Sequence, residues 1–321
     1  MKVGIVGFGS FGKWMAEFLR ERNFEIMISD VRRDTLKRYS DIYDIGTNIE
    51  VAKNSDIVIV AVPISKVVDV IREIGPYVKE GSLIMDITSV KSKPVKAMLK
   101  YVHNKVEVLG THPMFAPKIK SIDGEVIILV KGRGDVWYEK VKKFLRGEGV
   151  KVVETTCEEH DRLMSIIQGL THFVYISTAR TFYSMSVDVE KTRKLMSPVY
   201  EMMLDLIARI VGQNPELYAD IQMENPFITE VHSNYIEEAK KLAEIVKRKE
   251  KDVFVKKMRE ASYAIGDFEK AMAKSNKLIR RMREEYKILK SFLGGFRSSY
   301  RFSNDLNDGL YWNIQSFRLF L

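Results

Sequence analysis

The stretch Gly7–Gly12, which reads GFGSFG, constrains the fold of this chain more than any other feature. It matches the pattern G-x-G-x-x-G, and it lies between an apolar run, Val3–Val6, and a helical pattern that opens at Phe11. A glycine-rich turn between a strand and a helix is typical of dinucleotide-binding sites. The context therefore favours a bound dinucleotide over a simple turn without a ligand.

Each residue of the motif has an expected part in such a site. Gly7 makes the tight turn, Gly9 lets the backbone approach the pyrophosphate, and Gly12 lets the helix pack closely against the strand. Ser10 and Phe11 open the helix, whose amino terminus attracts the phosphates. We expect these five residues to bind the cofactor.

Residues 1–155 alternate short apolar runs with helical patterns, as expected for strands joined by helices in a mainly parallel sheet. The expected strands are Lys2–Val6, Glu25–Ser29, Asp56–Val62, Ser82–Asp86, Val106–Gly110, Glu125–Val130 and Val150–Glu154. The helical patterns include Ser10–Arg22, Ser65–Tyr77, Pro94–Val102 and Val136–Gly147. With the glycine motif, they predict a Rossmann dinucleotide-binding domain of the α/β class over residues 1–155.

The strand pattern stops near residue 156, and long helical patterns over 157–184, 198–212, 214–222 and 227–290 predict an all-α domain over residues 156–290. Two of these helices, 160–178 and 198–211, are apolar on most faces and must be buried. A small helical domain can bury them fully only against another copy, so we expect a homodimer. Residues 291–321 follow no pattern that we can place and form a tail of unknown role.

Asp30 and two arginines bear on the choice of cofactor. Asp30 ends the second expected strand, where a carboxylate would hold the ribose 2′-hydroxyl of NAD and repel the 2′-phosphate of NADP. Arg32 or Arg33 would instead bind that phosphate, unless both simply lie exposed at the start of a helix. These residues favour NAD as the cofactor, with NADP as the alternative.

The end of the strand Asp56–Val62 should border the same crevice, because ligands of such sheets lie beyond the carboxyl ends of the strands. Val62 and Pro63 would there contact the adenosine or the nicotinamide ribose. An ordinary turn between a strand and a helix explains these two residues equally well.

Two further strand ends carry polar clusters, residues 86–91 (DITSVK) and 110–117 (GTHPMFAP), and both should face the crevice. Ser89 is a helix cap, a substrate contact or both. His112 is held at the sheet edge by Pro113, which favours a functional role over that of an idle loop histidine. A neutral imidazole near pH 7 can take the proton that a hydroxyl loses on oxidation, so we expect His112 to be catalytic.

A polar stripe runs along the otherwise apolar helix that begins near residue 157. Asp161, Ser165, Gln168, His172 and Tyr175 recur at intervals of three or four residues, which places them on one face. Polar groups on a buried helix need a polar partner. We therefore expect this face to line the site; a hydrogen-bond network between helices is the alternative.

Glu201, Asp205 and Arg209 recur at intervals of four on the next apolar helix. Spacing alone favours an exposed ion pair between Asp205 and Arg209, worth about 0.2–0.5 kcal/mol. Arginine is also the residue that binds a carboxylate through two parallel hydrogen bonds. A role for Arg209 in binding an anionic substrate is therefore the alternative.

Composition argues against several classes of protein and partner. No apolar run reaches the ~18 residues of a membrane span, and the amino terminus lacks the features of a secretory signal. The single cysteine, Cys157, excludes an internal disulfide and a cysteine-rich metal site, so we expect a cytoplasmic protein without a metal. The net charge of +9 is concentrated in residues 239–290, where interspersed charges at helical spacing favour a solvated face over a nucleic-acid surface.

Five stretches read together resemble the prephenate/arogenate dehydrogenases: DITSVK, GTHPMFAP, CEEHDRLMSIIQGLTHF, SPVYEMMLDLIARI and QNPELYADI. The resemblance covers roughly residues 1–290, and this combination in this order is specific. It implies the NAD-dependent oxidative decarboxylation of prephenate to 4-hydroxyphenylpyruvate, in tyrosine biosynthesis. Arogenate, which has an amino group in place of the keto group, is the alternative substrate.

The resemblance also implies roles for single residues. In this family the histidine of the HP motif, here His112, accepts a hydrogen bond from the 4-hydroxyl of the substrate, and the serine beside it is here Ser89. A helical histidine, here His172, lines the pocket close to Gln168 of the polar stripe. An arginine of the later helix, here Arg209, binds a substrate carboxylate. The chain departs from the family pattern at residues 116–119 (APKI), so the loop over the substrate is expected to differ.

Two rival interpretations remain open. A 3-hydroxyacid dehydrogenase of the 6-phosphogluconate dehydrogenase-like group also joins a Rossmann domain to helices, but it uses a lysine on the first long helix, and residues 160–178 contain none. A nucleotide sensor or a nucleic-acid binder, neither of them an enzyme, would explain the basic helices. It would leave His112, Ser89, His172 and Arg209 without a function.

Overall fold

The computed structural model describes residues 1–296, with side chains as far as residue 284. The chain separates into two compact units. One comprises residues 1–196 and 200–249, and the other comprises residues 197–199 together with the chain from residue 250 onward. The sheet and the candidate site belong to the first unit.

An eight-stranded sheet opens the first unit, in the order β3-β2-β1-β4-β5-β6-β7-β8. Neighbouring strands are parallel except β6 and β7, which are antiparallel. Because β1 has β2 on one side and β4 on the other, the strand order reverses there, and the crevice beyond these strand ends is where such sheets bind ligands. The strands are β1 (Lys2–Val6), β2 (Glu25–Ser29), β3 (Asp44–Ile45), β4 (Ile57–Val60), β5 (Leu83–Asp86), β6 (Glu107–Pro113), β7 (Val126–Arg133) and β8 (Lys151–Thr155).

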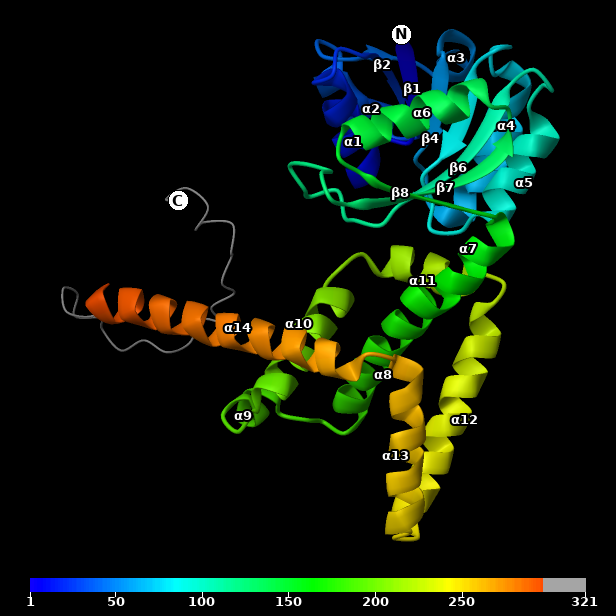
Figure 1. Cartoon of the computed structure of the whole chain (residues 1–321). Helices are drawn as coiled ribbons and strands as arrows, with labels where there is room; N and C mark the ends of the chain where they lie inside the picture. Colours follow the sequence, from blue (N-terminus) through cyan, green and yellow to red (C-terminus); the bar gives the residue numbers. More distant parts are fainter. Residues whose placement is uncertain (297–321) are drawn as a thin grey trace. The chain divides into compact units, whose positions relative to one another are not determined.

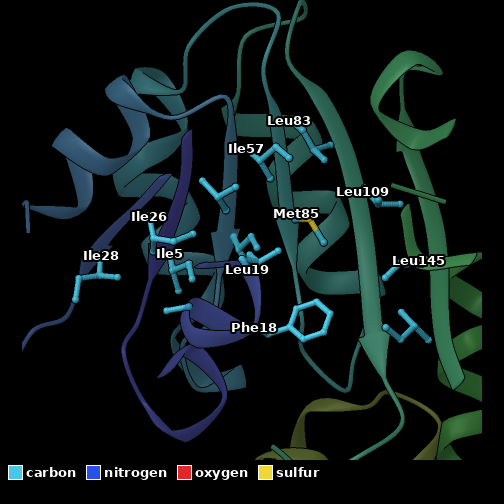
Figure 2. Close-up of a cluster of buried hydrophobic side chains, with 14 of the residues drawn as sticks. Ile5, Phe18, Leu19, Ile26, Ile28, Ile57, Leu83, Met85, Leu109 and Leu145 are labelled. Atoms are coloured by element: carbon cyan, nitrogen blue, oxygen red, sulfur yellow. The ribbon is translucent and has the colours of Figure 1, made fainter. Parts of the chain in front are cut away.

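Helices cover both faces of this sheet, so both faces form hydrophobic cores (Figure 1). Helices α1 (Ser10–Arg20) and α6 (Val136–Gly147) pack on one face, and α3 (Asn48–Asn54), α4 (Val67–Ile74) and α5 (Ser92–Tyr101) pack on the other. Alternate residues of a strand enter different cores, as Ile5 and Val6 do. Figure 2 shows the first core, where Phe18 of α1 and Leu145 of α6 pack with strand residues such as Ile57.

The predicted α/β domain is confirmed, with two differences along the chain. The short strand β3 and the short helix α2 (Arg33–Leu36) did not stand out in the sequence, because they are too brief to show a period. The strand expected to end at Gly110 continues to Pro113, since β7 pairs with it beyond the end of β5. His112 therefore lies inside β6, opposite Ile128, and not in a loop.

Within the part of the chain that the structure describes, only helices follow β8, as predicted. They are α7 (Cys157–Met164), the π-helix η4 (Ser165–Leu170), α8 (Thr171–Ser184), α9 (Val189–Arg193), α10 (Pro198–Val211), α11 (Pro215–Glu224) and α12 (Ile228–Lys247). The Thr156 hydroxyl caps α7 by accepting the backbone N–H of Glu159 at 3.2 Å. In the second unit, α13 (Lys251–Ile265) and α14 (Phe268–Phe296) complete the described chain. Helix α14 includes residues 291–296 of the expected tail, and residues 297–321 lie outside the described part.

The two apolar helices are only partly buried in a single chain. Helix α8 has no fully buried residue, and α10 buries only Leu204 and Ile207. Ile166 and Ile167 of η4 are about half exposed, at 54% and 50%. This exposure is in line with the expectation that these helices become buried only against another copy of the chain. Within the described residues, no helix is long and apolar enough to cross a bilayer.

Candidate active site

The glycine turn between β1 and α1 has the shape that a dinucleotide needs. Gly7 has a φ of +99°, and a Cβ there would lie 2.5 Å from the carbonyl oxygen of Ala61, so only glycine fits. A Cβ at Gly12 would lie 2.1 Å from the carbonyl oxygen of Gly7. At Gly9 a Cβ would meet no atom within 4 Å, which leaves open space beside the backbone for a phosphate group. Ser10 is exposed in the first turn of α1, where backbone N–H groups attract anions.

Asp30 lies beside this turn and holds it in place. One carboxylate oxygen accepts the backbone N–H of Phe8 at 2.8 Å, and the other accepts N–H groups of Arg32 from its backbone and side chain, at 2.9 and 3.2 Å. Burial alone would raise the pKa of Asp30, but the hydrogen bonds from Arg32 and Phe8 bring this pKa below its usual value. Asp30 is therefore an anion next to the expected ribose position, and the exposed Arg32 and Arg33 lie close by.

The loop after β4 connects the glycine turn to the helical part of the same unit. Val62 touches the turn, since its Cγ1 lies 2.8 Å from the position of a Cβ at Gly7, and Pro63 is exposed beside it. Two residues later, Ser65 donates its backbone N–H and its hydroxyl to Asp220 of α11, at 3.1 and 3.0 Å. The structure thus brings Val62 to the expected cofactor site.

A chain of hydrogen bonds begins at the predicted catalytic histidine. Nδ1 of His112 lies 2.9 Å from Nε2 of His160, and Nδ1 of His160 lies 2.8 Å from a carboxylate oxygen of Asp161. All three side chains are buried, with His112 only 2% exposed. The Asp161 carboxylate also accepts the backbone N–H groups of Lys91 and Ser92, at 2.8 and 2.9 Å. Helix α7 thereby anchors His112 and caps α5 through one acid.

These partners fix which nitrogen of each ring carries a proton. The Asp161 carboxylate only accepts hydrogen bonds, so Nδ1 of a neutral His160 is protonated and its Nε2 is an acceptor. Nδ1 of His112 must then be the donor to His160, which leaves Nε2 of His112 unprotonated and able to accept. A substrate hydroxyl next to Nε2 could donate its proton there, because this nitrogen carries none.

Electrostatics keeps both imidazoles uncharged at neutral pH. Burial, followed by the nearby charges of His160 and Lys91, lowers the pKa of His112 well below its usual value. Burial likewise lowers the pKa of His160, although Asp161 partly offsets that effect. For Asp161, hydrogen bonds from His160, Ser92 and Lys91 outweigh burial and lower the pKa of its carboxyl group. The site therefore contains two neutral imidazoles, His112 and His160, and the second of them donates to the Asp161 carboxylate.

Part of the predicted polar stripe reaches this histidine. Nε2 of Gln168 lies 3.4 Å from Nε2 of His112, and His172 packs edge-on against Tyr218 of α11 with ring centroids 4.6 Å apart. Gln168 lies in the π-helix η4, a rare element that is frequent at functional sites. Among the described residues, Oε1 of Gln168 and Nδ1 of His172 are buried without a hydrogen-bond partner. Such atoms are suited to bind a polar ligand.

Other predicted residues lie elsewhere. The hydroxyl of Ser165 donates to the carbonyl of Arg162, so this residue of the stripe has a local partner. Ser89 is half-buried in the turn before α5, but it does not cap that helix, because Asp161 binds the first backbone N–H groups. The helix-cap interpretation of Ser89 is therefore wrong, and its role as a substrate contact stays a prediction.

Arg209 is exposed on α10, and its role as a substrate contact stays a prediction. Its charge acts on Tyr218: burial raises the pKa of the Tyr218 hydroxyl, and Arg209 partly opposes that rise. Tyr218 is the residue that packs on His172, so a line of side chains leads from His112 through Gln168, His172 and Tyr218 toward Arg209.

An apolar cavity of about 290 Å³ lies between α1, α6 and the sheet, away from these polar groups. Thr111 and Pro113 line it, and these neighbours of His112 in β6 point to the opposite face of the sheet from the His112 side chain. With almost no polar lining, this cavity does not suit the charged groups that a dehydrogenase must bind.

Two contributors to the site were missed by reasoning from the residues. His160 and Tyr218 approach the predicted residues from distant parts of the chain. Lys91 belongs to the polar cluster 86–91 that was expected to face the crevice, but its complete burial was not foreseen. The only signal in the sequence was the pair His160-Asp161 in the first turns of a helix, where an acid beside a histidine can set its tautomer.

A Rossmann sheet with a glycine turn, an acid at the end of β2 and a buried neutral histidine in β6 is typical of dehydrogenases that use a nicotinamide dinucleotide. Comparison with known proteins agrees with this class. The sequence-family model for the prephenate dehydrogenase nucleotide-binding domain matches residues 15–154. The family model for the prephenate dehydrogenase dimerization domain matches residues 156–260. The chain belongs to the prephenate dehydrogenase family.

Individual relatives support this assignment. A "Probable arogenate/prephenate dehydrogenase" of Methanocaldococcus jannaschii is 44% identical over 299 residues, which are 90% of this chain and 67% of that protein. The "T-protein" of Haemophilus influenzae is 35% identical over 224 residues, 70% of this chain and 56% of that protein. The chain thus spans between about half and two thirds of these two relatives. The crystal structure of prephenate dehydrogenase from Aquifex aeolicus, a complex with hydroxyphenyl propionate and NAD+, has the same fold, with a TM-score of 0.67, 22% identity, and coverage of 82% of this chain and 96% of that one.

Proposed function

We propose that this chain is a cytoplasmic prephenate dehydrogenase that oxidises prephenate with NAD and releases carbon dioxide, yielding 4-hydroxyphenylpyruvate. The proposal is carried by the chain His112–His160–Asp161, which leaves Nε2 of His112 as a neutral acceptor. Oxidation of a ring hydroxyl needs such an acceptor, because the hydroxyl loses its proton as hydride leaves the same carbon.

The residues around the glycine turn fit a dinucleotide. Open space beside Gly9, the exposed amino terminus of α1 and the anionic Asp30 match a pyrophosphate followed by a ribose. When bound, the nicotinamide supplies the hydride acceptor of the reaction. We assign cofactor binding to Gly7, Gly9, Ser10, Phe11, Gly12, Asp30, Val62 and Pro63.

The protein's part in the chemistry is the movement of one proton. The 4-hydroxyl of the substrate donates to Nε2 of His112, which takes the proton as the carbonyl forms. The positive charge on His112 is then stabilised through His160 by the Asp161 carboxylate. Loss of carbon dioxide leaves a phenolate oxygen, and His112 returns the proton to it. The base is therefore restored at the end of each turnover.

Substrate binding falls to the line of side chains beyond His112. Prephenate carries two carboxylates, and Arg209 is the cation that we assign to one of them. Gln168 and His172 present buried polar atoms without a partner, and both side chains are uncharged at neutral pH. Prephenate is the substrate that we propose, and arogenate is the alternative.

The proposal is tested with the purified chain, prephenate or arogenate as substrate, and NAD or NADP as cofactor. We expect reduction of NAD with prephenate, together with 4-hydroxyphenylpyruvate and carbon dioxide in equal amounts. Formation of tyrosine from arogenate would mean that arogenate is the substrate, while the reaction would still be an oxidative decarboxylation. A protein that binds NAD and turns over neither substrate would overturn the proposal and favour the nucleotide-sensor alternative.

The choice of NAD over NADP depends on the charge of Asp30. Replacing Asp30 with asparagine keeps an oxygen for the Phe8 N–H but removes the charge that repels a 2′-phosphate. We expect Asp30→Asn to bind NAD about tenfold more weakly, as for one lost charged hydrogen bond, and to gain affinity for NADP through Arg32. Dissociation constants for both cofactors measure the change, with the exposed Asp34→Asn as control. A wild type that binds NADP more tightly would contradict the assignment.

The exposed apolar residues of η4 and α10 support a homodimer, in agreement with the match to a dimerization domain. We expect light scattering at micromolar concentration to give twice the 37.1 kDa of one chain. Ile167→Asp, at a position that is 50% exposed, should shift this equilibrium toward the monomer, because a charge in an apolar interface is costly to desolvate. Val136→Asp, in an exposed residue of the Rossmann domain, is the matched control. A wild type that stays monomeric would refute the dimer.

A further inference from the structure

Lys91 is buried completely, although its role in the reaction is not evident from the sequence. It lies between β5 and α5, and its ammonium group forms an ion pair with Asp86 at the end of β5. Nζ also donates to the backbone carbonyl of Thr111 at 2.7 Å and to the hydroxyl of Thr88 at 3.4 Å. Burial lowers the pKa of Lys91, and the charge and hydrogen bond of Asp86 oppose that fall. Three acceptors surround a group with three N–H donors, which is the hydrogen-bonding pattern of the charged form.

The position of these contacts relates Lys91 to both ends of the histidine chain. Thr111 immediately precedes His112 in β6, so the bond from Nζ restrains the backbone that carries the base. The backbone N–H of Lys91 donates to the Asp161 carboxylate at 2.8 Å, at the other end of the chain. Gly110 makes room for the lysine stem: a Cβ there would lie 3.1 Å from Cδ of Lys91. Lys91 thus contacts both the backbone next to His112 and the Asp161 carboxylate.

We propose that Lys91 is a positioning residue of the dehydrogenase reaction, which holds the backbone beside His112 through Thr111 and holds Asp161, the acid that orients His160 against His112. This inference rests on the proposed function, because it concerns the base that the function requires. It differs from a purely structural role, in which the buried ion pair would only stabilise the sheet edge and would leave the titration of His112 unchanged.

The charged and titratable groups around His112 make the electrostatic part testable. His160 of α7 and Lys91 act on His112 directly, and Asp86 of β5 with Asp161 and Cys157 of α7 act on Lys91. Gln168 of η4, which also contacts His112, is neutral. Burial has the largest effect on His112, followed by His160 and Lys91, and all three lower its pKa. Without the Lys91 charge, the pKa of His112 should rise. Since the neutral ring is the active form, activity is lost as pH falls through that pKa, and the loss should begin at a higher pH.

The experiment compares the dependence of kcat/KM on pH in four variants and the wild type. Lys91→Met removes the charge, and Asp86→Asn combined with Lys91→Met removes the whole ion pair, which avoids an unpaired buried carboxylate. Lys91→Arg keeps the positive charge but carries it on a side chain of different shape. Lys93→Met removes an exposed lysine two residues away and is the matched control. Thermal unfolding and NAD affinity are measured in parallel, to identify variants that fail to fold.

We expect the acidic limb of the profile to move up by on the order of one pH unit in Lys91→Met, as for the loss of a nearby like charge. The shift should be smaller in the double variant, because that variant also removes the opposite charge of Asp86. The limb should stay in place in Lys91→Arg and Lys93→Met. An unshifted limb in a folded Lys91→Met overturns the inference, even if kcat falls. If Lys91→Met does not fold, a folded double variant with the limb and kcat of the wild type overturns it. A wild type without dehydrogenase activity would instead overturn the proposed function, so the two failures are distinguishable.

Discussion

Replacing His112 with asparagine should lower kcat by about 10²–10⁴-fold and change KM little. Asparagine fills a similar space and retains a donor toward His160, but it cannot take the proton that the substrate hydroxyl loses. This proton transfer takes place in the transition state, so its loss appears mainly in kcat. Steady-state kinetics with saturating NAD measures the effect.

His103→Asn is the control for this variant, because His103 is exposed and lies outside the site. It should leave kcat and KM at the wild-type values. Affinity for NAD should be preserved in both variants, since neither residue belongs to the glycine turn. A His112→Asn variant with nearly normal kcat would transfer the role of base to another residue, and His172 would be the first candidate.

Replacing Arg209 with alanine should raise KM for prephenate by about 10- to 150-fold, the effect of about 1.5–3 kcal/mol for a lost hydrogen bond to a charged group. The upper values expected for a desolvated ion pair do not apply, because Arg209 is exposed in the single chain. Affinity for NAD should hardly change, since Arg209 lies on the side of Tyr218 and not at the glycine turn.

Arg72→Ala serves as the control for Arg209, because Arg72 is an exposed helical arginine that pairs with Asp69 on α4. It should leave the KM for prephenate as it is. If Arg209→Ala instead lowers only the thermal stability, Arg209 is a structural residue that pairs with Asp205, and the carboxylate site must lie elsewhere. Measuring KM and the unfolding temperature in the same preparations separates these outcomes.

The order of the domains could be predicted because local patterns along the chain encode it. A short continuous apolar run such as Val3–Val6 reflects a strand with two buried faces, and the change to helical spacing near residue 156 reflects the end of the sheet. The glycine turn was equally readable: Gly7 needs a positive φ, and a Cβ at Gly12 would meet the Gly7 carbonyl. These constraints act between residues that are close in sequence.

The surroundings of the predicted base could not be read in this way. His112 stood out at a strand end, but its burial depends on β7, which pairs with β6 beyond β5. Its partner His160 lies 48 residues further along the chain. Arg209 lies exposed on α10, and its role as a substrate contact stays a prediction.

The sequence by itself determined the class of fold, the location of the dinucleotide turn and the identity of His112 as a candidate base, because periodicity and turn geometry are local properties. Only the tertiary structure decided the tautomer of His112 and the burial of Lys91. A pKa and a tautomer depend on desolvation and on hydrogen bonds shorter than about 3 Å. Both depend on contacts between residues of β5, β6 and α7, which are far apart in the sequence. Residue spacing along the chain therefore does not predict them.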